Sequence, residues 1–179
     1  AVMAELHAKG HQATLWNAKT APEKLDGVVV LAPEAGYDDA ALKAVFFEAQ
    51  TASKLLNGKG VFATVSRMDG RLGFTGAFGE ASALTGSLAG LSKTASHEWE
   101  SVTCRALDVA STFDSMKTAA QSVVAELFVD GPLEVGLSPE GRVSLQLKTE
   151  SIDADEPLAF TSEDVIVVSG GARGVTAEV

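Results

Sequence analysis

The sequence predicts an α/β protein with a mostly parallel sheet and helices on both of its faces. Short apolar runs rich in β-branched residues alternate with longer stretches whose apolar residues recur at helical spacing, and this alternation is typical of a parallel sheet. The chain has 179 residues, the size of one domain or of one domain with a fragment of another. Hydrophobic residues make up 46% of the chain, which argues against disorder.

The first half of the chain contains two predicted helices and two predicted strands. Residues 1–9 have a helical pattern that Gly10 ends, and residues 11–16 follow as a short strand. Residues 27–33 are a continuous apolar run, typical of a strand covered on both faces. Residues 39–57 form the clearest helix.

The helix predicted at residues 39–57 has an apolar stripe and recognisable ends. Asp38 or Asp39 can cap its start, and Gly58 can end it. The stripe consists of Leu42, Val45, Phe46, Ala49, Ser53 and Leu56.

The middle of the chain continues the alternation. Residues 60–68 are a predicted strand, a glycine-rich loop follows, and residues 80–100 are a long predicted helix. Gly86 and Gly90 weaken this helix, so we expect a neighbouring element to approach its backbone closely there.

The last third of the chain adds four further elements. Residues 102–110 are a predicted strand, residues 114–128 a helix, and residues 133–148 a hairpin. An acidic connector at residues 151–163 leads to a last predicted strand at residues 165–168.

Charge and composition exclude several classes of protein. The net charge of −10 disfavours binding to phosphate backbones or anionic lipid, so we expect no nucleic acid and no membrane as partner. The apolar runs are too short to span a bilayer, and the first residues do not resemble a signal peptide, so we expect a cytoplasmic protein. Because residue 1 lies inside a helical pattern, we also expect the natural chain to extend upstream.

Common catalytic and metal-binding patterns are absent from the sequence. Cys104, the only cysteine, lies in a strand pattern and is interpreted as a buried apolar residue rather than a nucleophile. His7, His11 and His97 lack metal-ligand spacing, and there is no G-x-S-x-G or G-x-x-x-x-G-K-[ST] motif.

A Tyr-x-x-x-Lys pair would suit a reductase of this fold. The lysine lowers the tyrosine pKa, so that the phenol can exchange a proton with a carbonyl oxygen. The only tyrosine is Tyr37, and Ala41 stands at the lysine position. The sequence therefore predicts no complete reductase chemistry in this chain.

The final residues suggest a nucleotide site. Glycines after a strand let the backbone approach a pyrophosphate, and the helix that follows offers unpaired N–H groups. The guanidinium of Arg173 can pair with a ribose 2′-phosphate, which favours NADPH over NADH. An ordinary glycine-rich turn and a solvent-facing arginine are the alternatives. The predicted cofactor-binding residues are Ser169, Gly170, Gly171, Arg173, Gly174 and Val175.

The segment "SGGARGVTAE" resembles the start of the catalytic half of a ketoreductase domain in the polyunsaturated fatty acid synthases of marine bacteria, relatives of modular polyketide synthases. The short-chain dehydrogenase pattern is T-G-x-x-x-G-x-G. Ser169 takes the threonine position, and Gly170 and Gly174 take the first two glycine positions. Thr176 departs from the last glycine. In the wider family a basic residue at the place of Arg173 accompanies NADPH.

Residues 61–110 resemble the structural half of such a ketoreductase, which is a degenerate Rossmann-like unit that binds no cofactor and supports the catalytic half. When the helix at residues 80–100 is aligned with the catalytic helix of the family, Ser82 takes the tyrosine position and Gly86 the lysine position. The resemblance therefore implies that both catalytic groups are missing here. It covers most of residues 25–179.

The resemblance implies a truncated, degenerate Rossmann-like open parallel sheet with flanking helices and a hairpin near its C-terminus. Residues 1–150 would be the structural subdomain, 151–163 the connector, and 164–179 the first strand and glycine turn of the NADPH-binding subdomain. The parent protein would reduce a β-ketoacyl thioester, and the partners would be the catalytic subdomain and the acyl carrier domains of the same synthase. The predicted helices at residues 39–57 and 80–100 would present a surface to the catalytic subdomain.

Two other functions stay open on the sequence. The chain could be a non-catalytic docking or scaffold module of a megasynthase, in which case the glycine turn is only structural. It could also be an independent small nucleotide-binding protein. The absence of a glycine turn after residues 27–33 argues against the last of these.

Overall fold

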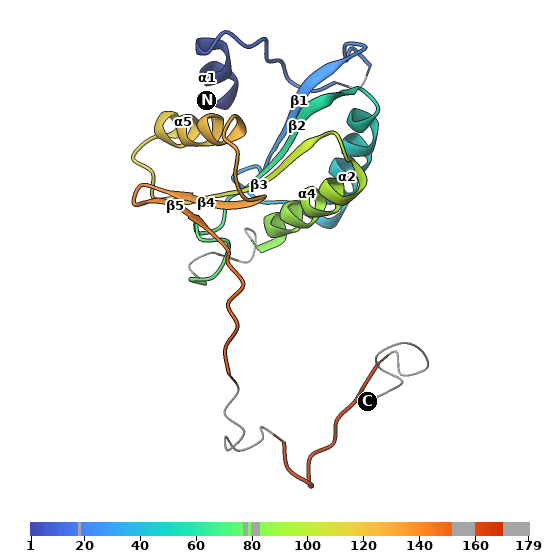
Figure 1. Cartoon of the computed structure of the whole chain (residues 1–179), viewed down its shortest axis with the longest axis vertical. Helices are drawn as coiled ribbons and strands as arrows, with labels where there is room; N and C mark the ends of the chain where they lie inside the picture. Colours follow the sequence, from blue (N-terminus) through green and yellow to red (C-terminus); the bar gives the residue numbers. More distant parts are fainter. Residues whose placement is uncertain (18, 77–78, 80–82, 152–159, 170–179) are drawn as a thin grey trace. The chain divides into compact units, whose positions relative to one another are not determined.

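The computed structural model describes residues 1–17, 19–76, 79, 83–151 and 160–169 (Figure 1). The chain divides into two compact units, Ala1–Gln146 and Leu147–Val179. The helices and strands of the described residues all belong to the first unit.

A five-stranded sheet forms the centre of the first unit. Its strands lie in the order β1-β2-β3-β4-β5. The first four are parallel, and β5 runs antiparallel to β4 in a hairpin. The predicted mostly parallel sheet with a C-terminal hairpin is thereby confirmed. The strands are β1 (Leu25–Leu31), β2 (Leu56–Ser66), β3 (Thr103–Val109), β4 (Glu134–Ser138) and β5 (Gly141–Ser144).

Helices cover both faces of the sheet. One face carries α2 and α4, and the other carries α5 with α1 packed beside it (Figure 1). The chain steps across the sheet in the same direction each time, yet α5 lies opposite α2 and α4. The β3–α5–β4 connection therefore has the opposite hand to the two before it, although nearly all such connections are right-handed. The helices are α1 (Val2–Ala8), α2 (Asp39–Ser53), the 3-10 turn η1 (Leu84–Gly86), α4 (Ser87–Glu98) and α5 (Met116–Leu127).

Two apolar clusters hold the layers together, because neighbouring residues of β2 point to opposite faces. Phe62 is fully buried on the α2–α4 side, where its ring meets Trp99 edge to face. Ala63 and Val65 pack on the other side against α5. The α5 cluster consists of Ala63, Val65, Leu107, Val109, Ala119, Val123, Leu127, Val135 and Leu137.

Of the residues predicted to begin and end α2, the structure confirms the N-cap but not the C-terminal glycine. The carboxylate of Asp38 accepts a hydrogen bond from the Ala41 N–H at 2.7 Å, as an N-cap. Gly58 does not end the helix, contrary to the prediction. The helix ends at Ser53, because Leu56 already pairs with Leu25 in the sheet.

Two predicted strands are wrong. Residues 11–16 are not in a strand, and neither are residues 165–168, whose side chains are 49–91% exposed. A strand needs a hydrogen-bonded neighbour, and apolar β-branched composition alone does not supply one. The run at residues 27–33 does form β1, but no residue of β1 is fully buried, because β1 is an edge strand of the described sheet.

The predicted helix at residues 80–100 is shorter in its described part, where η1 leads into α4. The expected close approach is confirmed at Gly86, where a Cβ atom would lie 3.2 Å from the Met68 sulfur. It is wrong for Gly90, because a Cβ atom there would have no neighbour within 4 Å.

Candidate functional site

Asp108 organises the loop that follows β2. This side chain is 1% exposed, at the end of β3. Its Oδ1 accepts hydrogen bonds from the Ser66 hydroxyl at 3.0 Å and the Met68 N–H at 2.8 Å. Its Oδ2 accepts from the N–H groups of Asp69 at 3.3 Å and Leu72 at 3.0 Å. A buried carboxylate is stable only with such partners, so Asp108 fixes the loop to the carboxyl edge of the sheet.

Asp69 stabilises the same loop through hydrogen bonds to residues within it. Its Oδ1 accepts from the N–H groups of Arg71 and Gly73, both at 2.8 Å. Its Oδ2 accepts from the Thr75 N–H at 2.9 Å and the Thr75 hydroxyl at 2.6 Å. Burial opposes the charged form, but these hydrogen bonds outweigh burial and hold the pKa of Asp69 well below its usual value of 3.8.

Acid is expected to remove the contribution of Asp69 to stability. A pKa lowered by folding means that the unfolded chain binds the proton more readily, so the contribution is complete above pH 3.8 and is lost as the pH falls toward the folded pKa. Asp69→Asn should therefore lower the free energy of unfolding at neutral pH and flatten its fall as the pH drops below about 4, as measured by urea unfolding. An Asp114→Asn control should keep the wild-type slope, since Asp114 is exposed. A wild-type slope in Asp69→Asn would contradict the assignment.

The loop packs directly on the backbone of β4. A Cβ atom on Gly70 would lie 2.5 Å from the Leu137 carbonyl oxygen, and one on Gly136 would lie 2.3 Å from the Gly70 oxygen. Leu72 has a φ of +61°, which is rare for a residue with a branched side chain. The surroundings therefore impose the conformation of Leu72, and such positions concentrate at functional sites.

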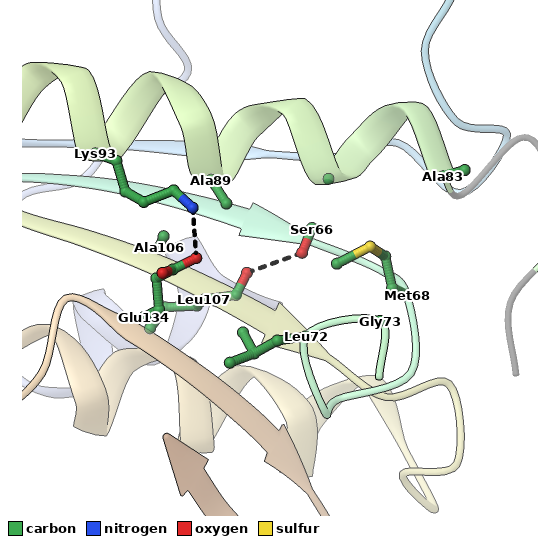
Figure 2. A pocket seen from close by; sticks show the side chains of 11 residues that line it. Ser66, Met68, Leu72, Gly73, Ala83, Ala89, Lys93, Ala106, Leu107 and Glu134 are labelled. Atoms are coloured by element: carbon green, nitrogen blue, oxygen red, sulfur yellow. Dashed lines mark hydrogen bonds and ion pairs between the residues drawn. The ribbon is translucent and has the colours of Figure 1, made fainter. Parts of the chain in front are cut away.

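A pocket lies between this loop, α4 and the strands β3 and β4 (Figure 2). Its volume is about 370 Å³. Lys93 reaches from α4 toward Glu134 of β4 and forms an ion pair with it at 3.0 Å, where the two side chains are 48% and 22% exposed. The lining residues are Ser66, Met68, Leu72, Gly73, Ala83, Gly86, Ala89, Lys93, Ala106, Leu107 and Glu134.

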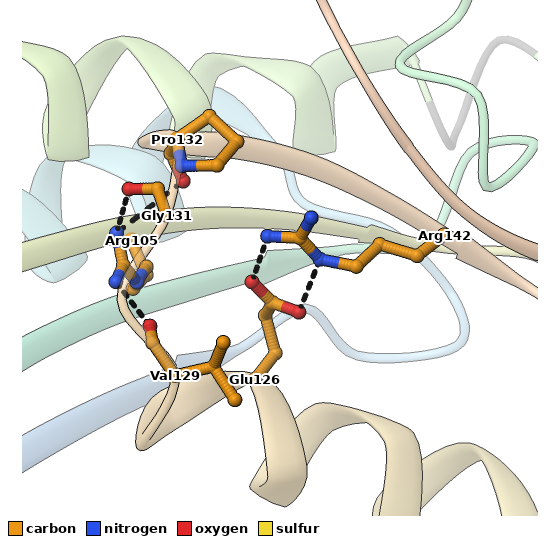
Figure 3. A network of polar contacts seen from close by, with 6 residues as sticks. All are labelled: Arg105, Glu126, Val129, Gly131, Pro132 and Arg142. Carbon is orange, nitrogen blue, oxygen red and sulfur yellow. Dashed lines mark hydrogen bonds and ion pairs between the residues drawn. The ribbon is translucent and has the colours of Figure 1, made fainter.

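A polar network on the opposite face ties α5 to the sheet (Figure 3). The guanidinium of Arg105 is buried and donates to the carbonyl oxygens of Val129, Gly131 and Pro132, which follow the C-terminal end of α5. These carbonyl oxygens supply the hydrogen-bond acceptors that a buried guanidinium needs. Glu126 and Arg142 form a two-pronged ion pair with both distances at 2.7 Å. The Glu126–Arg142 pair attaches β5 of the hairpin to α5.

Apart from Ser169, the predicted cofactor site lies outside the described residues. Ser169 is exposed and lies in a turn. Gly170, Gly171, Arg173, Gly174 and Val175 lie outside the described residues. Their role toward NADPH therefore stays a prediction.

The other candidate residues have structural surroundings. The Tyr37 hydroxyl donates to the Leu31 carbonyl oxygen at 3.2 Å, and burial raises the pKa of Tyr37. Burial likewise raises the pKa of Cys104 to about 11, despite the opposing charge of Arg105. Cys104 is thus a protonated, buried thiol, as the sequence predicts. Within the described part of the chain, no three His, Cys, Asp or Glu side chains are grouped to hold a metal ion.

No helix in the described ranges combines the length and apolar character needed to cross a bilayer.

Sequence reasoning missed the site built by Asp108 and Asp69. The sequence does contain a usable signal. Asp108 lies in an apolar strand pattern, so its buried charge needs hydrogen-bond donors, and a glycine-rich loop elsewhere in the chain can supply backbone N–H groups. The partners of Asp108 are up to 42 residues away in the chain, so spacing could not reveal them.

Fold and site together define a class: a partial Rossmann-like α/β sheet with a hydrogen-bonded polar loop at its carboxyl edge, next to a small pocket. In an alignment of 142 residues that covers 74% of its length, the chain is 35% identical to one of the proteins that make up the polyunsaturated fatty acid synthase of Thraustochytrium sp. (strain ATCC 26185 / S-3). The chain spans only 5% of that protein. No family model and no solved structure matches the chain. The resemblance to such a synthase is confirmed to this extent, and the ketoreductase assignment stays a prediction.

Proposed function

We propose that this chain is the structural half of an NADPH-dependent β-ketoacyl reductase domain in a multidomain polyunsaturated fatty acid or polyketide-type synthase of the cytoplasm, and is not catalytic by itself. The observation that carries the proposal is the 35% identity to a synthase protein over 142 residues. The partial Rossmann-like sheet supports it, because reductase domains of this kind are built on such sheets.

The parent reaction would convert a β-ketoacyl thioester on an acyl carrier domain to the β-hydroxyacyl form. NADPH would supply the hydride when bound to the parent domain. From this chain, Ser169, Gly170, Gly171, Arg173, Gly174 and Val175 would contribute to its phosphate-binding turn. A tyrosine, a serine and a lysine beyond residue 179 would polarise and protonate the carbonyl oxygen.

The described residues support a non-catalytic role. The Tyr37 phenol donates to the Leu31 carbonyl oxygen and has a raised pKa, so it is poorly suited to proton exchange at neutral pH. At the lysine position of the family stands Gly86, which packs against Met68 instead. Ser82, at the tyrosine position, lies outside the described residues.

The exposed side of α2 and α4 supplies a surface for the catalytic half. A groove of about 390 Å³ lies between the two helices, which we call the α2–α4 groove. Phe46 is 49% exposed and Phe47 61% exposed on α2. Exposed apolar surface of this kind usually marks an interface. The residues of the α2–α4 groove are Leu42, Lys43, Val45, Phe46, Ser87, Leu88, Gly90, Leu91 and Thr94.

An NADPH titration followed by nicotinamide fluorescence tests the proposal. We expect no saturable binding by the 179-residue chain and clear binding by a version extended by about 200 residues, the rest of a domain of ordinary size. The extended protein should also reduce a β-ketoacyl thioester. Tight binding by the short chain would overturn the proposal, because the crevice would then be complete within these residues.

The second candidate function is a docking or scaffold module of the same synthase. The α2–α4 groove supports this function as strongly as it supports a role as the structural half of a reductase, because either role requires an exposed surface for a partner. Arg173→Ala in the extended protein separates the two. A scaffold module predicts unchanged NADPH affinity, whereas loss of a charge-assisted contact to phosphate should weaken binding about tenfold or more.

A further inference from the structure

The pocket beside the β2 loop is lined by residues from separate segments of the chain, which makes it a candidate binding site. Its walls come from three separate parts of the fold, namely the loop, α4 and the β3–β4 strands (Figure 2). Small side chains such as Ala89 and Ala106 keep it open, and Gly86 adds no side chain. Its volume of about 370 Å³ lies in the lower part of the range of small-molecule sites, roughly 300–1,000 Å³.

The loop wall of the pocket is held in place. Leu72 lines the pocket with its backbone in the left-handed region. A rigid wall lowers the entropy that a ligand must offset on binding. The carboxylates of Asp108 and Asp69 supply this rigidity, because between them they accept hydrogen bonds from the backbone N–H groups of Met68, Asp69, Arg71, Leu72, Gly73 and Thr75.

The polar end of the pocket selects the charge of its ligand. Lys93 and Glu134 are paired there at 3.0 Å, so the pocket end carries no net charge. A charged ligand would compete with one partner of the pair and leave the other unpaired. An amide satisfies both partners, because its carbonyl oxygen accepts from the ammonium of Lys93 while its N–H donates to the carboxylate of Glu134. Apolar walls at Met68 and Leu72 suit the methylene groups on either side of an amide.

We propose that this pocket binds a neutral, flexible chain with amide groups, of the pantetheine type that acyl carrier domains present. The choice of this chain rests on the proposed function, which supplies a carrier domain as partner. Dinucleotides fit poorly, since their phosphates need several cations and the pocket lining offers only Lys93, which is already paired.

The test is a titration of the isotope-labelled 179-residue chain with pantetheine, followed by NMR chemical shifts. Saturable shifts at Lys93, Ala89 and Glu134 are expected. Ala89→Leu, which fills the pocket from a helix, should weaken binding about tenfold or more. Ala44→Leu on the exposed side of α2 is the matched control and should bind like the wild type.

Glu134→Gln gives a second, shape-preserving variant. It leaves Lys93 without its counter-ion, so pantetheine should bind several-fold more weakly and 4′-phosphopantetheine more tightly than in the wild type. Absence of saturable shifts in the folded wild type, or equal affinity in Ala89→Leu, would overturn the proposal. Reductase activity of the extended protein is scored separately. If the extended protein is active but this pocket does not bind pantetheine, the pantetheine proposal is wrong and the proposed function stands. If the pocket binds pantetheine but the extended protein is inactive, the proposed function is wrong and the pantetheine site stands.

Discussion

Gly70→Ala is expected to lower the free energy of unfolding by about 2–5 kcal/mol. Gly70 has a φ of +69°, and a side chain in this region costs roughly 1–2 kcal/mol. A Cβ atom would also lie 2.5 Å from the Leu137 oxygen and 2.7 Å from the Ala110 Cβ. Overpacking costs typically about 1–3 kcal/mol, and backbone atoms yield less readily than side chains. Urea unfolding followed by circular dichroism measures the loss.

Gly76→Ala is the matched control for the Gly70 prediction. Gly76 has almost the same φ, +68°, but a Cβ atom there would meet nothing within 4 Å. It should lose only the conformational cost of about 1–2 kcal/mol. Equal losses in the two variants would show that the loop does not press on β4 as described.

Asp108→Asn is expected to cost about 3 kcal/mol, although the two side chains have the same shape. Four donors converge on the carboxylate, and an amide nitrogen in place of one oxygen leaves two of them facing another donor. Each buried group left without a partner costs about 1–3 kcal/mol. The loop wall of the pocket should loosen at the same time, which faster amide hydrogen exchange at Leu72 would report.

The exposed Asp114 provides the control for Asp108 as well. Asp114→Asn changes the charge by the same amount and should alter the free energy of unfolding by no more than about 0.5 kcal/mol. A neutral effect of Asp108→Asn would mean that Asp108 does not hold the loop.

Local pattern is sufficient for the elements whose signals lie within a few residues. Apolar spacing predicts the helix at residues 114–128, and Ser115 caps it by accepting from the Thr118 N–H. The turn at Pro139 and Glu140 predicts the hairpin, and β4 and β5 pair on either side of that turn. Caps, turns and periodicity are properties of short segments, so a sequence displays them directly.

Strand pairing is not predictable in the same way. Residues 28–31 and 165–168 are both short apolar runs, yet only the first pairs, with β2. Whether such a run becomes a strand depends on a neighbour elsewhere in the chain, which propensity does not contain.

The sequence by itself determined the alternation of strands and helices, the hairpin, the burial of Cys104 and the absence of a Tyr-x-x-x-Lys pair. Only the tertiary structure decided that Asp108 holds the β2 loop, that α5 covers the face opposite α4, and that Lys93 meets Glu134 in a pocket. The physical reason is distance along the chain. Periodicity and capping act over one or two turns, whereas a buried carboxylate, a crossover and a pocket each join segments that only folding brings together.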